Sequence, residues 1–201
     1  MIQSPELAAA LDAAEAAARV IRELYQKNLA VRLKEDKSPV TEADVRAEEA
    51  IKGVLQARFP GHAFYGEETG RSGDADSLWL VDPIDGTKAF VREYPMFSTQ
   101  IALLRAGRLV LGVSSAPLYG ELAWAERGAG AFLNGRPLRV STIDTLEQAA
   151  LSSGNLKTLA LDGGRWNRYG AVVARVNRIR GYGDFLHYHL LAGGKLDAVV
   201  E

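Results

Sequence analysis

The sequence predicts a fold of the α+β or α/β class, in which helix and sheet layers alternate. Two helical patterns come first, β-rich segments separated by turn signals follow, and helix and strand patterns alternate towards the end. A chain of 201 residues can form one domain or two small coupled ones. We expect an N-terminal α+β part over residues 1–140 and the start of a C-terminal α/β part over residues 141–201.

The N-terminal segment predicts two amphipathic helices. In residues 5–27 apolar side chains recur at steps of three and four, and Ser4 is a suitable cap. The same spacing recurs over residues 41–58, where Pro60 and Gly61 end the pattern. Both helices should present an apolar face to a sheet.

The middle of the chain predicts an antiparallel meander. Its four β-rich runs are SLWLVD, FSTQIALL, RLVLGVSSA and GELAWAE, at residues 77–82, 97–104, 108–116 and 120–126.

From about residue 141 helices and strands should alternate. We expect a helix over 166–176, a strand near Arg178, a helix over 184–192 and a strand within LDAVVE, residues 196–201.

Composition excludes several classes of partner and chemistry. Twenty-four basic and 25 acidic residues leave a formal charge of -1, which argues against a nucleic acid polymer or an anionic membrane as the main partner. The chain contains no cysteine, so disulfides and thiolate chemistry are excluded. The sequence has neither a membrane-span pattern nor a signal-peptide pattern. We expect a cytoplasmic location.

The stretch SLWLVDPIDGTKAF places two acids, Asp82 and Asp85, at the end of an apolar strand. A buried carboxylate must be paired, hydrogen-bonded, protonated or metal-bound. Glu67 and Glu68 lie shortly before, and no arginine cluster is near enough in sequence to neutralise all four. Mg²⁺ prefers oxygen ligands of this kind. The acids therefore predict a magnesium site.

The residues that follow the acids predict an anion site. Gly86 and Thr87 should present backbone N–H groups at the start of the next helix. Taken alone, however, Asp-Pro and Asp-Gly pairs are also ordinary turn and cap chemistry. The spacing does not match a calcium-binding loop.

Three motifs carry a resemblance to a known family. KSPVTEAD at 37–44, GEE at 66–68 and DPIDGT at 82–87, in that order and spacing, resemble the inositol-monophosphatase superfamily of magnesium-dependent phosphatases. The segment 107–141 is also similar to the central sheet of that family. The resemblance covers essentially the whole chain and implies the layered fold of this phosphatase type.

The resemblance implies a set of metal ligands. They are Glu67, Asp82, Asp85 and the carbonyl of Ile84, with Glu67 also acting in catalysis. Glu68 would lie outside the ligand set.

The phosphoryl group would be held by Asp82, Ile84 and Asp85 through the metals, and by Gly86 and Thr87 directly.

Asp44 and Thr87 correspond to the pair that holds the attacking water in the family. Asp44 has an alternative role, because an acid three residues after Thr41 suits a helix cap. Lys37 matches a lysine near the water site, or is a solvated loop charge.

Residues 178–201 resemble the histidinol-phosphate phosphatases of this superfamily. The resemblance implies that Asp184 lies near the substrate's cationic, non-phosphate end, where a carboxylate would favour an ammonium or imidazole group. The alternative is that Asp184 only caps the following helix. An inositol phosphate, sugar phosphate or nucleotide is the alternative substrate. A metal- and phosphate-binding homologue without activity is the non-enzymatic alternative.

The resemblance also implies a homodimer and a longer C-terminal part. In the family a Trp-Asp segment follows the strand that corresponds to LDAVVE, and its aspartate completes a second metal site. We expect the C-terminal part to be incomplete, as a fragment or a natural short form with a weakened second site.

Overall fold

The computed structural model describes residues 3–27, 29–34 and 39–201. The chain divides into two compact units, Met1–Arg136 and Pro137–Glu201.

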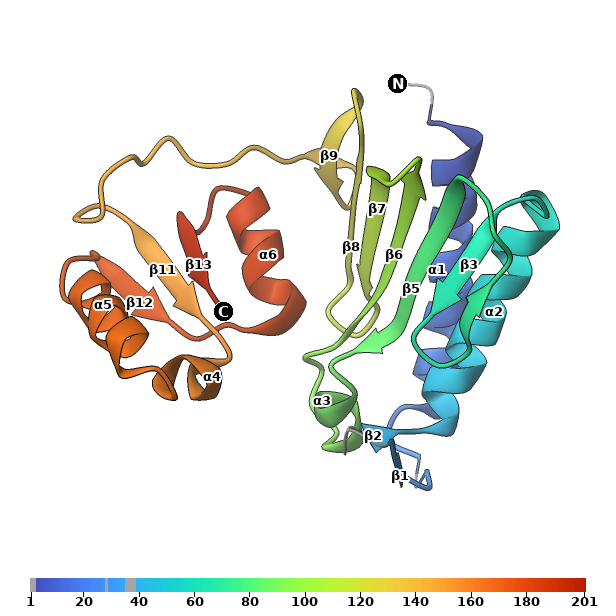
Figure 1. Ribbon diagram of the computed structural model, residues 1–201, viewed down its shortest axis with the longest axis horizontal. Coiled ribbons are helices and arrows are strands. Elements are labelled where there is room, and N and C mark those ends of the chain that lie inside the picture. Colours follow the sequence, from blue (N-terminus) through green and yellow to red (C-terminus); the bar gives the residue numbers. More distant parts are fainter. Residues whose placement is uncertain (1–2, 28, 35–38) are drawn as a thin grey trace. The chain divides into compact units, whose positions relative to one another are not determined.

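Two long helices cover one face of the sheet in the first unit. They are α1 (Pro5–Leu24) and α2 (Glu42–Arg58), which pack against each other and against the sheet (Figure 1). Ser4 caps α1, since its side chain accepts a hydrogen bond from the N–H of Leu7 at 3.0 Å. The buried face of α1 is mostly alanine, and such small side chains let α2 and the sheet approach closely. Both predicted helices are confirmed, although α1 ends three residues before residue 27.

An eight-stranded sheet forms the centre of this unit, in the order β10-β9-β8-β7-β6-β5-β3-β4. Its strands are β3 (Ala63–Gly66), β4 (Gly70–Ser72), β5 (Ser77–Asp85), β6 (Ser98–Arg105), β7 (Arg108–Ala116), β8 (Glu121–Glu126), β9 (Gly130–Leu133) and β10 (Arg136–Pro137). Strands β5 to β8, which contain the four predicted runs, pair antiparallel in sequence order, so the predicted meander is confirmed. The unpredicted β9 continues it by pairing antiparallel with β8. The sequence did not predict β3, which pairs parallel to β5, or β4.

Three short elements complete the unit. The strands β1 (Arg32–Leu33) and β2 (Pro39–Val40) pair antiparallel, and the helix α3 (Thr87–Val91) follows β5.

Strand β5 runs further than the sequence predicted, through both acids to Asp85. Asp82 pairs with Gln100 and Asp85 with Ser98, so β5 has one more residue than β6 in this interval. This is a β-bulge, and it includes Pro83, which has no N–H to donate to the sheet. The turn expected at Asp82 is therefore an irregular continuation of the strand.

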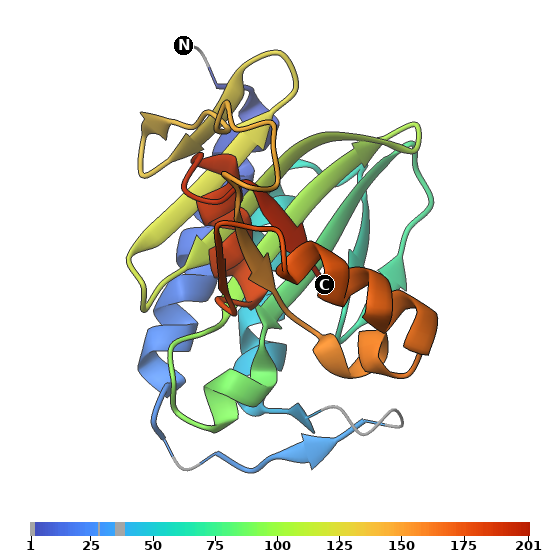
Figure 2. The ribbon, with the colours of Figure 1, turned by 90° about the vertical axis from the view of Figure 1, so that its left-hand side faces the viewer.

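The second unit is a three-stranded parallel sheet in the order β12-β11-β13. Its elements are β11 (Ala150–Ser153), α4 (Leu156–Ala160), α5 (Gly163–Val173), β12 (Arg178–Arg180), α6 (Asp184–Ala192) and β13 (Ala198–Val200). Helix α5 lies on one side of this sheet and α6 on the other (Figure 1 and Figure 2).

The predicted alternation in this unit is confirmed, although α5 starts and ends three residues earlier than predicted and two further elements are present. Helix α5 starts three residues before residue 166, because the side chain of Asp162 caps it by accepting from the N–H of Arg165. Strand β11 and the short helix α4 were not predicted.

Candidate metal and phosphate site

Strand pairing brings Glu67 next to Asp82. The parallel register pairs Gly66 with Val81, and the N–H of Glu67 donates to the carbonyl of Val81 at 3.0 Å. Glu67 directly follows Gly66, the last residue of β3, and Asp82 directly follows Val81 in β5. Both acids therefore lie at the same end of these two neighbouring strands. Residues 15 positions apart in sequence thus meet because β3 and β5 are neighbours.

The bulge in β5 places Asp82 and Asp85 on one face of the sheet. Side chains alternate along a strand, and one additional residue returns Asp85 to the face of Asp82. The bulge is held by Thr99, whose hydroxyl donates to the carbonyl of Pro83 at 2.8 Å, and by the N–H of Ile84, which donates to Oδ1 of Asp82.

These carboxylates crowd one another. Burial raises the pKa of Asp82 to about 8, and the adjacent Glu67 and Asp85 contribute to the rise because like charges disfavour ionisation. Acids that repel in this way are stabilised by a cation.

Lys34 provides one positive charge at this edge. Its Nζ donates to Oε1 of Glu67 and to Oε1 of Glu68, both at 2.7 Å. Although partial burial opposes the charge, these hydrogen bonds raise the pKa of Lys34 above its ordinary value. Sequence reasoning missed this residue, since a lysine after a short strand looks like any solvated charge. Lys37, the lysine it did select, lies outside the described residues.

The predicted ligands suit a divalent cation by chemistry. Three carboxylates and the carbonyl of Ile84 are the hard oxygen donors that Mg²⁺ takes. Burial is the main cause of the raised pKa of Asp82, and the charges of Glu67 and Asp85 add to it. Across residues 3–27, 29–34 and 39–201, no three acidic or histidine side chains form a preassembled metal cage. Lys34 engages one oxygen of Glu67, so its contact does not by itself prevent the carboxylate from binding a metal.

Asp44 uses its two oxygens for two purposes. Oδ2 accepts from the N–H and from the hydroxyl of Thr41, each at 2.7 Å, in a capping box at the start of α2. Oδ1 accepts from the hydroxyl of Thr87 at 3.2 Å. Burial raises the pKa of Asp44, while the hydrogen bonds from both threonines oppose the rise. Asp44 therefore both caps α2 and contacts Thr87.

Thr87 lies between Asp44 and the carbonyl group of Ile84. Its hydroxyl lies 3.2 Å from Oδ1 of Asp44 and 3.1 Å from the carbonyl oxygen of Ile84. A hydroxyl has one proton, so these acceptors share it or receive it in turn.

Gly86 precedes Thr87 with φ at 102°, a conformation that favours glycine. A Cβ there would lie 2.7 Å from the carbonyl oxygen of Met96. No larger residue fits this turn.

Asp184 belongs to the second unit. It is the first residue of α6, after the cap residue Gly183, and has φ at 46°. No side chain caps this helix. Burial raises the pKa of Asp184, the carboxylate of Glu201 raises it further, and His187 opposes the rise.

Sequence reasoning missed Glu201. Its Oε2 lies 2.9 Å from Nε2 of the buried His187 and accepts from the hydroxyl of Tyr188 at 2.9 Å. An acid directly after a short apolar strand, as in LDAVVE, was the available signal. Asp184 and Glu201 thus place two acidic side chains in the same part of this unit.

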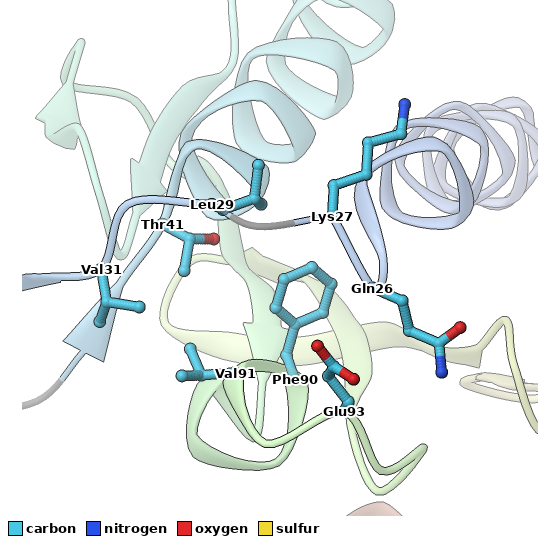
Figure 3. A pocket seen from close by; sticks show the side chains of 8 residues that line it. All are labelled: Gln26, Lys27, Leu29, Val31, Thr41, Phe90, Val91 and Glu93. Carbon is cyan, nitrogen blue, oxygen red and sulfur yellow. The ribbon is translucent and has the colours of Figure 1, made fainter.

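A cavity of about 180 Å³ lies beside Thr41 in the first unit (Figure 3). Figure 3 shows Thr41 and Phe90 facing it, and its lining is Gln26, Lys27, Leu29, Val31, Thr41, Phe90, Val91 and Glu93. This lining contains none of the predicted metal ligands, so the cavity is not the predicted metal site.

Comparisons of the sequence and of the structure with known proteins lead to the same group of phosphatases. The inositol monophosphatase family matches residues 2–201. A histidinol-phosphatase from Chlorobaculum parvum is 36% identical over 200 residues, which cover 98% of this chain and 77% of that protein. One from Mycobacterium tuberculosis is 42% identical over 180 residues, covering 87% and 69%. The structure of a Thermotoga maritima IMPase has a TM-score of 0.85 and 31% identity, covering 98% and 76%. In the described part of the chain, no helix has the length and apolar character needed to cross a membrane.

Proposed function

We propose that this chain, which belongs to the inositol monophosphatase family, is a magnesium-dependent histidinol-phosphate phosphatase. The family match and the histidinol-phosphatase relatives make it a phosphomonoester hydrolase that acts on small phosphate esters. The identity of the ester, the metal and the roles of the site residues are the proposal.

The arrangement of Asp44, Thr87 and Ile84 is the observation that carries the proposal. One hydroxyl lies within hydrogen-bonding distance of a buried carboxylate and of the carbonyl between the two strand-end acids. A water that donates a hydrogen bond to Oγ1 of Thr87 would lie near the predicted ligand Ile84, and so near the proposed metal. Thr87 would donate its own hydroxyl proton to Oδ1 of Asp44 as the water oxygen bonds to phosphorus. The P–O bond to the substrate's alcohol would break in the same step, and the departing alkoxide would take a proton from solvent. A raised pKa suits Asp44 to accepting a proton.

The proposed ligands are Glu67, Asp82, Asp85 and the carbonyl of Ile84. A magnesium ion bound there would supply positive charge to the phosphoryl oxygens and acidify the attacking water. The backbone N–H groups of Gly86 and Thr87 are proposed to add hydrogen bonds to the phosphoryl group.

The substrate class is supported by charge in the second unit. Burial and the negative charge of Glu201 both raise the pKa of Asp184, so a cationic substrate group beside Asp184 would stabilise its carboxylate. Histidinol phosphate carries an ammonium and an imidazole, whereas inositol phosphate offers only hydroxyls. The names of the relatives favour the same choice. The homodimer implied by the resemblance is also proposed, and light scattering after size-exclusion chromatography tests it.

A substrate panel tests the proposed function. The purified protein is assayed for phosphate release from histidinol phosphate, inositol 1-phosphate and a sugar phosphate, each with Mg²⁺ and with chelator. We expect kcat/KM to be highest for histidinol phosphate and activity to disappear with chelator. A higher kcat/KM for inositol 1-phosphate would assign the other substrate class, and turnover that resists chelator would refute the metal mechanism.

A further inference from the structure

Glu48 is a buried acid that neither the proposed ligand set nor the water-holding pair includes. It lies on α2 one helical turn after Asp44, and its side chain is 0% exposed. Its Oε2 accepts from the N–H of Glu68 and its Oε1 accepts from the N–H of Thr69, each at 2.8 Å. The carboxylate thus binds the turn that joins β3 to β4.

A carboxylate is a costly way to fill a core position. Burying it without compensation costs several kcal/mol, whereas an apolar side chain of similar size would be stabilising. Here the compensation comes from two backbone N–H groups, and charge-assisted hydrogen bonds of this kind are stronger than neutral ones. The interaction fixes a particular backbone conformation rather than adding apolar packing.

The β3–β4 turn approaches the carboxylate of Glu48 closely at Gly66. A Cβ on Gly66 would lie 2.3 Å from the carboxylate carbon of Glu48, so only glycine allows this approach. The next residue, Glu67, is held on its other side by the hydrogen bond from its N–H to the carbonyl of Val81. The backbone of Glu67 is therefore fixed by β5 and, through its neighbours, by α2.

We propose that Glu48 is a positioning residue that holds the metal ligand Glu67 beside Asp82. This inference rests on the proposed function, because it requires Glu67 to bind metal. Residues four apart lie on one face of a helix, so α2 presents Asp44 and Glu48 together. The single helix α2 would then set the spacing between the carboxylate of Asp44 and the turn that carries Glu67.

The test measures magnesium binding separately from stability. Glu48→Gln keeps the size of the side chain but places an NH₂ group against a backbone N–H, so one hydrogen bond is lost. We expect the Mg²⁺ concentration at half-maximal thermal stabilisation to rise about tenfold or more, as when groups behind metal ligands are removed elsewhere. The same rise is expected in the Mg²⁺ concentration that half-activates turnover, with a smaller change in KM for substrate.

The control is Glu49→Gln, which removes the same charge from an exposed position on the same helix. We expect it to leave the Mg²⁺ dependence unchanged. If Glu48→Gln does not fold, Gly66→Ala perturbs the same contact from the turn, and it should also raise the Mg²⁺ requirement.

The outcomes separate the two proposals. Magnesium dependence like that of the unmodified protein in the folded Glu48 variant, or in Gly66→Ala, would show that Glu48 is merely structural, even if the metal-free melting temperature falls. An unmodified protein that gains no stability from Mg²⁺ would overturn the proposed function and this inference together.

Discussion

The hydroxyl of Thr87 lies 3.2 Å from Oδ1 of Asp44, while Oδ2 of the same carboxylate caps helix α2 through Thr41. One buried side chain thus connects the start of α2 to the start of α3, 43 residues away in sequence. Because the cap fixes the carboxylate, Oδ1 is already oriented towards Thr87 before any substrate binds. Substituting Thr41, the partner of Oδ2, therefore tests the contribution of Asp44 to stability. Substituting Thr87, the partner of Oδ1, tests its proposed role in catalysis.

Thr87→Val should impair catalysis more than stability, because it removes the hydroxyl that contacts Oδ1 of Asp44 and the carbonyl oxygen of Ile84 but leaves the cap of α2 intact. Steps of proton transfer are typically worth about 10² to 10⁴ in rate, so we expect kcat to fall at least about 100-fold. Thr41→Val removes the hydroxyl that faces Oδ2 and should cost about 1 kcal/mol of unfolding free energy, with a smaller effect on kcat. Urea unfolding and steady-state kinetics on both variants make the comparison. A larger loss of kcat in Thr41→Val than in Thr87→Val would show that the proton of the attacking water does not pass through Thr87.

The metal-free protein should lose stability as pH rises from about 4 to about 8. Asp82 has a pKa of about 8 in the folded protein against an ordinary value of 3.8. Between these values the folded state keeps a proton that the unfolded state has released, so unfolding free energy falls by up to about 1.4 kcal/mol per pH unit. The contribution of Asp82 is complete below the lower pKa and is lost above the higher one.

Urea unfolding in chelator across this pH range measures the effect. Asp82→Asn should flatten the profile, because the variant has no proton to lose at this position. Adding Mg²⁺ at pH 8 should restore stability to the unmodified protein but not to the variant. Parallel profiles for the two proteins would mean that another group causes the pH dependence.

Lys34→Met should destabilise the metal-free protein and increase the stabilisation that Mg²⁺ provides. Lys34 donates to both Glu67 and Glu68, so its removal leaves their charges without this counter-ion. A bound metal would replace that charge at Glu67. Differential scanning fluorimetry with and without Mg²⁺ measures both shifts, and Lys157→Met, at an exposed position of the second unit, is the control. An equal Mg²⁺-induced shift in all three proteins would argue that Lys34 and the metal bind separate groups.

Asp184→Asn should change substrate preference rather than overall activity. Charge-assisted contacts are worth about 1.5 to 3 kcal/mol, so kcat/KM for histidinol phosphate should fall about tenfold or more relative to that for inositol 1-phosphate. Asp197→Asn is a matched control in the same unit, because the carboxylate of Asp197 accepts from the N–H of Ala150 at 2.6 Å and serves the fold. We expect the control to lower stability without changing the ratio. Equal losses on both substrates in Asp184→Asn would make Asp184 structural.

The sequence by itself determined the elements that depend on local pattern. The helical spacing of α1 and α2, the β-rich runs of the meander and the glycine after Asp85 are all local signals, and each appears in the structure. The four-residue strand β3 and the three-residue strand β4 are too short to show a period, so they were not predicted.

Only the tertiary structure decided which side chains meet. The pairing of β3 with β5 brings Glu67 to Asp82, and the packing of α2 brings Asp44 to Thr87 and Glu48 to the β3–β4 turn. In the sequence Glu48 is one acid among several on a helix, and nothing local distinguishes it from the exposed Glu49. Contacts between residues far apart in the chain depend on strand register and helix packing, because these are set by burial across the whole unit and not by neighbours in sequence.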